Sequence, residues 1–161
     1  MFLWFVIVAP VVVAEVFRSP MLDYRFVAAG AVLPVVELLI WWKPLHSLVG
    51  SVVVLTVVML VTQGRRLVRR RWLGLPIGLF LHLVLDFVWT VDELFLWPFL
   101  GISFDEVTPP LVARPLIISG LLEVFALGIG WWAWRRYELS DAANRQLLAT
   151  RGQLSRSVMP T

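Results

Sequence analysis

Two ionisable side chains lie inside an apolar segment of the sequence, residues 73–91. His82 and Asp86 are four positions apart, so on a helix they share one face, one turn from each other. The segment is long enough to cross a bilayer, which takes roughly 20 apolar residues. An ionisable group at mid-membrane costs about 2.5 to 3.5 kcal/mol on insertion scales, so such groups usually face a bundle interior and serve a function. Imidazole and carboxylate groups bind metals and transfer protons, and this pair therefore predicts a functional site.

The composition is that of an integral membrane protein. Of 161 residues, 60% are hydrophobic and only 16% are charged, whereas soluble domains carry about 25% charged residues. The length favours one domain. Because the chain has no cysteine, any bound metal must be held by His, Asp or Glu. The arginines cluster beside apolar segments, which is typical of membrane-orienting charge and argues against nucleic-acid binding.

Five apolar segments predict an all-α, polytopic membrane helix bundle with about five transmembrane helices. The first segment has no basic leader and no small-residue cleavage site, so we interpret it as a retained helix. The expected spans are residues 2–17, 26–42, 45–62, 73–91 and 115–134. They form a transmembrane domain over residues 1–134, and residues 135–161 form a polar cytoplasmic tail that is partly helical.

The distribution of arginine predicts the orientation in the membrane. Residues 64–72 contain five arginines. If this segment is cytoplasmic, five spans place the N-terminus outside and the C-terminal tail inside. Twelve of the 14 Lys and Arg residues then lie on the cytoplasmic side, with Lys43 and Arg114 outside, as the positive-inside rule requires. The long outer loop, residues 92–114, is apolar enough to lie in the interface or to cover a site as a lid.

This topology brings four polar side chains to one depth. Glu37 lies near the outer end of the second span, His46 begins the third, and Asp86 and His82 lie in the fourth. Two imidazoles and two carboxylates suit a divalent metal, with Zn preferred and Mn or Fe as alternatives, and one carboxylate could act as general base. The same four groups could equally form a hydrogen-bonded cluster that holds the helices together. Glu123, in the middle of the fifth span, is a candidate to orient His82.

The sequence around these residues resembles a known family. VLPVVELLIWWKPLHS and HLVLDFVWTVDELFLWPF are similar to the LexA-regulated membrane hydrolases, metal-dependent hydrolases of the bacterial inner membrane. Their pattern is LPDxD, then HRGxTHS, then HxxxD before a Trp-Pro-Phe segment, and the resemblance covers residues 31–101. It assigns family site positions to Glu37, His46, His82 and Asp86. Two further motif positions, an Asp and a His in the family, are occupied here by Val35 and Trp41.

These observations predict a metal-dependent hydrolase of the bacterial cytoplasmic membrane, acting on a lipid or lipid-linked ester or phosphoester near the outer leaflet. Its metal would be held by the four residues above, with Glu37 and Asp86 as the catalytic groups. Membrane lipids are the expected partners. The alternative is a non-catalytic subunit that stabilises or regulates a larger complex with other membrane proteins, which the substitutions at Val35 and Trp41 favour. A small transporter or proton path is a third hypothesis, and the absence of an internal repeat argues against it.

Overall fold

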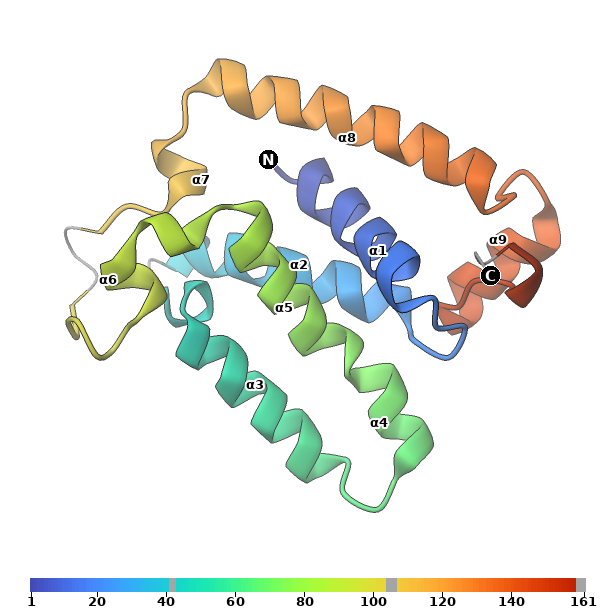
Figure 1. Ribbon diagram of the computed structural model, residues 1–161, viewed down its shortest axis with the longest axis horizontal. Coiled ribbons are helices and arrows are strands. Elements are labelled where there is room, and N and C mark those ends of the chain that lie inside the picture. Colours follow the sequence, from blue (N-terminus) through green and yellow to red (C-terminus); the bar gives the residue numbers. More distant parts are fainter. Residues whose placement is uncertain (41–42, 104–106, 159–161) are drawn as a thin grey trace.

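The secondary structure of the protein is helical throughout the residues that the structure describes, which are 1–40, 43–103 and 107–158 of a computed structural model (Figure 1). This confirms the all-α prediction. The α-helices are α1 Leu3–Phe17, α2 Tyr24–Glu37, α3 Leu48–Val61, α4 Arg66–Trp72, α5 Gly74–Leu85, α6 Asp92–Phe95, α7 Pro110–Ala113, α8 Leu116–Arg136 and α9 Ala142–Arg151. Short 3₁₀ turns are η1 Leu38–Ile40, η2 Pro44–His46, η3 Val88–Thr90 and η4 Arg156–Val158.

Local sequence determines where several of these helices begin and end. Asp23 and Ser47 are the N-caps of α2 and α3, where their side chains accept hydrogen bonds from backbone N–H groups two or three residues further on. Asp141 does the same for α9. At the other end of α9, Gly152 takes the left-handed conformation (φ 66°), and Phe87 takes it (φ 60°) just after α5. The helix that carries His82 therefore stops at Leu85.

Helix α5 lies at the centre of the bundle (Figure 1). Its most extensive contact is with α2, while α1 and α3 pack against it elsewhere and α8 packs on the outer side of α1. The main core lies between α1, α2 and α8 and includes the fully buried side chains of Phe5, Val13, Val27 and Ala31. Both histidines and Asp86 thus come from elements at or beside the central helix.

Two glycines allow α2 and α5 to approach closely. A Cβ atom on Gly78 of α5 would collide with the carbonyl oxygen of Val27, and one on Gly30 of α2 would collide with that of Leu75. Small residues at such crossings are typical of membrane helix pairs. Since every side chain placed on α5 depends on this contact, the glycines help to position the site.

We expect Gly78→Ala to lower the free energy of unfolding by about 1 to 3 kcal/mol, because the added methyl group must displace backbone. Denaturant unfolding of the detergent-solubilised protein would measure this. The matched control is Gly120→Ala on α8, where an added Cβ meets no atom within 4 Å. That change should be neutral or stabilise by up to about 1 kcal/mol, since alanine is the better helix former. Equal effects at the two positions would contradict the close α2–α5 contact.

Only one helix in the described part of the chain has the length and composition of a complete membrane span. This helix is α8, with 21 residues, most of them exposed. Helices α1, α2, α3 and α5 have 15, 14, 14 and 12 residues, or roughly 18 to 23 Å at 1.5 Å per residue, against a hydrocarbon core of about 30 Å. The five-span bundle is therefore not confirmed.

The predicted helix boundaries need three corrections. The second apolar segment is helical only to Glu37 and continues as η1, and the fourth is helical to Leu85 instead of residue 91. In the fourth segment the cause is the left-handed backbone at Phe87, which breaks the helical path. The arginine-rich segment, predicted as a loop, contains helix α4.

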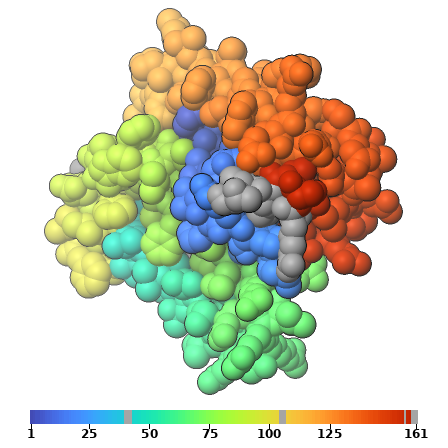
Figure 2. All heavy atoms as spheres, turned by 45° about the vertical axis from the view of Figure 1, so that its right-hand side comes forward, coloured from blue at the N-terminus to red at the C-terminus, as the bar shows by residue number. Residues whose placement is uncertain are grey.

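The C-terminal segment packs against the junction between α1 and α2. The carbonyl oxygens of Ala149 and Gly152 accept hydrogen bonds from the Arg25 side chain and the Tyr24 backbone N–H, both at 2.7 Å. Figure 2 shows the red C-terminal residues lying between the orange of α8 and the blue of the N-terminal helices. The predicted polar tail is partly helical, as α9, and its end is docked on the bundle.

Asp23 holds this junction together. Its carboxylate is fully buried and accepts hydrogen bonds from Nε and Nη2 of Arg25 at 3.0 and 2.8 Å, and Nη2 of Arg71 lies 3.4 Å away. Burial alone would raise the pKa of Asp23, but the hydrogen bonds and charge of the two arginines outweigh it and hold the pKa below its usual value. The ionised carboxylate thus stabilises the docked tail.

We expect acid to release the tail. Because the folded-state pKa of Asp23 is lowered, its contribution is complete above the unfolded-state pKa of about 3.9 and is lost as the pH falls through the folded-state value. Hydrogen exchange of α9 across this pH range would detect the release. Asp23→Asn should increase α9 exchange already at neutral pH, whereas Asp92→Asn, at an exposed position, should not. Protection of α9 that is independent of both pH and Asp23 would contradict this role.

Candidate metal centre

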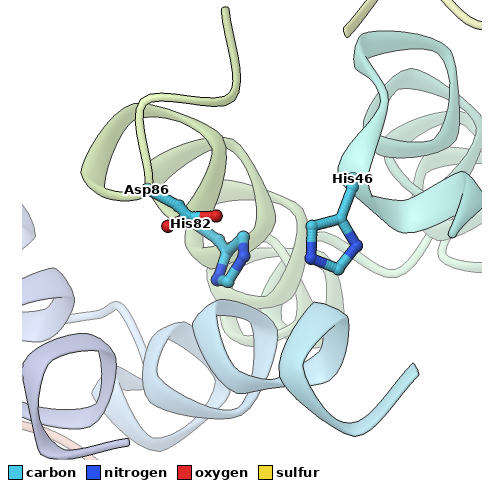
Figure 3. Close-up of side chains that lie close together, drawn as sticks. All are labelled: His46, His82 and Asp86. Carbon is cyan, nitrogen blue, oxygen red and sulfur yellow. The ribbon is translucent and has the colours of Figure 1, made fainter. Parts of the chain in front are cut away.

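Three of the four predicted site residues lie together in the interior. His46 comes from η2, His82 from α5, and Asp86 directly follows α5. All three side chains are fully buried, and one ligand atom of each lies within 4.8 Å of the others. In Figure 3 the two imidazole rings face each other, with Asp86 beside His82, and the ring centroids are 5.2 Å apart. Two ligands of one zinc ion lie at most about 4.2 Å apart, so small side-chain rotations would bring the three together on an ion.

The position of His82 leaves one of its ring nitrogens without a partner. Nδ1 lies 2.8 Å from the carbonyl oxygen of Ala31 on α2, and since a carbonyl only accepts, Nδ1 must donate. In the neutral ring Nε2 then carries the lone pair, and this buried atom has no hydrogen-bond partner among the described residues. The ring of Phe5 packs against the imidazole at a centroid distance of 4.2 Å. His82 is therefore held in one orientation with a free lone pair.

His46 has the same arrangement, with a carboxylate in place of the carbonyl. Its Nδ1 lies 3.2 Å from Oε2 of Glu37, and its buried Nε2 has no partner among the described residues. Both Glu37 oxygens also lie 3.0 Å from the Leu45 N–H, which donates to them. The structure thus places Glu37 behind His46, on the ring nitrogen other than Nε2. Carboxylate groups in this position are common in metal sites, where they fix the tautomer of the ligating histidine.

Asp86 uses its two carboxylate oxygens differently. Oδ2 accepts a hydrogen bond from the backbone N–H of Leu111 at 3.1 Å, which ties the outer loop to the end of α5. Oδ1 is buried without a hydrogen bond and lies 3.4 Å from Nη2 of Arg114. The same Nη2 donates to the Asp86 backbone carbonyl at 3.1 Å. One carboxylate oxygen therefore organises the loop, and the other is available to a ligand.

Arg114 and Lys43 are site-associated residues that the sequence analysis did not identify as such. The Arg114 side chain is only 11% exposed. The Lys43 side chain is buried, and its Nζ donates to the carbonyl oxygen of Val107 at 2.7 Å. Their sequence signal was available: they are the two basic residues that the predicted topology leaves outside the cytoplasm. Both hold described parts of the outer loop against the bundle.

The outer loop also has its own small core. Val88, Leu94 and Val107 pack with Leu83 of α5 into a buried cluster separate from the main core. Together with the bond from Leu111 to Asp86, this packing keeps the described part of the loop next to the candidate ligands. The lid interpretation of this loop stays a prediction.

The remaining sequence predictions for the site have mixed outcomes. The predicted contact between Glu123 and His82 is wrong, because Ala31 occupies Nδ1 of His82 while Glu123 accepts a hydrogen bond from the Leu3 N–H at 3.0 Å. Glu123 instead connects α8 to α1. Val35 is half-buried and packs against the main core. Trp41 lies outside the described residues.

Comparisons with known proteins identify the family. The model of the YdjM inner membrane protein family matches residues 43–149, about two-thirds of the chain. This range contains His46, His82 and Asp86 but ends short of Glu37. Comparison with curated proteins and with solved structures gives no match. The chain belongs to the YdjM inner membrane protein family, and it is an all-helical member of it.

Proposed function

We propose that this protein is a metal-dependent hydrolase whose metal is held by His46, His82 and Asp86. The observation that carries the proposal is that Nε2 of both histidines and Oδ1 of Asp86 are buried together without hydrogen bonds. Unpaired buried polar atoms are costly and rare. A metal ion would give all three atoms a partner at once.

The donor set favours a particular chemistry. Two imidazoles and one carboxylate leave a fourth position open on a tetrahedral zinc ion, as in several hydrolytic zinc enzymes, and Mn or Fe would fit less well. When bound, such a metal supplies Lewis acidity and activates water at neutral pH. In the overall reaction water adds across an ester or phosphoester bond, and an acid and an alcohol are released.

The neighbouring side chains have separate roles in this proposal. Ala31 and Glu37 orient His82 and His46, so Glu37 acts as a positioning residue in place of the ligand and catalytic roles expected from the sequence. Asp86 keeps its predicted role as a ligand. Arg114, 3.4 Å from Asp86 Oδ1, provides a buried positive charge suited to an anionic group on the substrate.

The family and the surface of the molecule support a lipid or lipid-linked substrate. The chain is an inner membrane protein by family, and α8 presents large apolar side chains to its surroundings, among them Leu116, Val124 and Trp131. We retain the multi-pass topology with the N-terminus outside and the C-terminus in the cytoplasm as part of the proposal, because the arginine distribution favours it. The site then faces the outer leaflet.

Metal analysis of the purified full-length protein tests this function. We expect about one equivalent of a divalent metal, hydrolysis of an ester or phosphoester lipid, loss of activity with a chelator, and recovery with zinc. His46→Ala should lose both metal and activity. A folded protein that carries no metal above background after supplementation would contradict the proposal. A stable co-purifying membrane protein in that case would favour the non-catalytic subunit.

A further inference from the structure

A cavity of about 570 Å³ lies beside the candidate metal centre, between α2, η2 and α3. Its size falls within the range of about 300 to 1,000 Å³ that is usual for small-molecule sites. Apart from one carboxylate, the side chains that line it are apolar. The main wall residues are Leu33, Val36, Leu45, Val49, Val53 and Trp97.

The one acidic residue in the wall connects the cavity to the candidate metal centre. Glu37 lines the cavity, and its Oε2 lies 3.2 Å from Nδ1 of His46. The imidazole of His46 is thus all that separates Glu37 from the lone pair of Nε2. A molecule with an apolar part in the cavity and a polar part at its inner end would have that polar part close to the proposed ligands.

The rim of the cavity is exposed and apolar. Val36 and Val53 are 52% and 53% exposed, and α3 continues the same character with Val52, Val57 and Leu60. In an inner membrane protein such a surface borders the acyl chains of the bilayer. A polar molecule from the aqueous phase would lose its hydration in these walls without gaining hydrogen bonds. The occupant that suits both the walls and the rim is therefore a hydrocarbon chain arriving from the membrane.

We infer that this cavity binds one acyl chain of a membrane lipid and seats the lipid with its ester or phosphoester linkage at His46, His82 and Asp86. The position of the linkage rests on the proposed hydrolase function. The binding of the chain itself does not, because it depends only on the apolar walls and their opening.

Photo-crosslinking with a lipid probe tests the inference. The full-length protein is reconstituted in vesicles of phosphatidylethanolamine and phosphatidylglycerol that contain a phosphatidylethanolamine with a diazirine on one acyl chain. After irradiation, the labelled residues are mapped by mass spectrometry. We expect labelling concentrated on the wall segments 33–37 and 45–53, above the labelling of equally exposed apolar positions on α8. Uniform labelling of all exposed apolar faces would overturn the inference.

Cavity-filling variants make the test specific. Val49→Trp and Leu33→Trp fill the cavity from opposite walls, and each should lower wall labelling about tenfold because the indole ring occupies the space of the chain. Val52→Trp adds the same ring at an exposed position on α3 that does not line the cavity, and should leave labelling unchanged. If both filling variants keep the helical circular dichroism of the wild type and still label at its level, the cavity does not bind the chain.

The two proposals can fail separately. His82→Asn, which removes a proposed metal ligand outside the cavity wall, should abolish hydrolysis and leave labelling intact. Labelling of the wall without metal or hydrolysis in the wild type would overturn the hydrolase function and keep the lipid site. Hydrolysis without wall labelling would do the reverse.

Discussion

An Asp86→Asn variant is expected to bind metal about a thousandfold more weakly than the wild type while keeping its fold. Zinc binding in proteins is worth on the order of 10 kcal/mol, so each of three ligands contributes several kcal/mol. Asparagine has nearly the same shape as aspartate, and its amide oxygen can still accept the hydrogen bond from the Leu111 N–H at the position of Oδ2. The NH₂ group then occupies the position of Oδ1 and has no lone pair for a metal.

Competition with a chelating dye would measure the affinity, and circular dichroism would verify the fold. Asp92→Asn is the matched control, because Asp92 is an exposed carboxylate on α6, six positions further along the chain. It should bind metal as the wild type does. If Asp86→Asn retains wild-type affinity, Asp86 is not a ligand, and the cluster is better explained as a set of polar contacts between helices.

The fold was predictable from the sequence as far as helices follow from apolar segments. All five segments contain helices, and the spacing of His82 and Asp86 gave their relative position correctly. The early end of α5 was not predictable, because Phe87 is a residue type that rarely adopts positive φ, and no glycine or proline marks the position. Hydrophobicity alone continues smoothly through residues 86–91 and cannot reveal a change in backbone direction.

The site was predicted in its residue types but only partly in its roles. Matching of depth brought His46 to His82 because short turns keep neighbouring helix ends level. The role of Glu37 depended on the exact path through η1 and η2, which turns the Leu45 N–H toward the carboxylate and fixes Glu37 behind His46. Arg114 was missed because a residue in a long loop has no periodicity that would place it.

Glu37→Gln is expected to weaken metal binding by about tenfold, and Glu37→Leu by about a hundredfold. In the proposed arrangement Glu37 does not bind the metal but orients His46 and makes its imidazole a stronger donor. Glutamine keeps an oxygen that can accept from Nδ1 of His46 but loses the negative charge. Leucine removes the acceptor altogether, so His46 is free to rotate and the Leu45 N–H is left without this partner.

These two variants separate the two roles that Glu37 could have. If Glu37 were a direct ligand, as the sequence predicts, Glu37→Gln would remove metal as completely as Asp86→Asn. A graded loss from glutamine to leucine, measured by the same chelator competition, is the signature of a positioning residue. Glu93→Gln, at an exposed position on α6, provides the control for loss of a carboxylate and should not change the affinity. Because Glu37 also lines the acyl-chain cavity, the uncharged variants should retain lipid labelling, and its loss would mean that the charge of Glu37 takes part in seating the lipid.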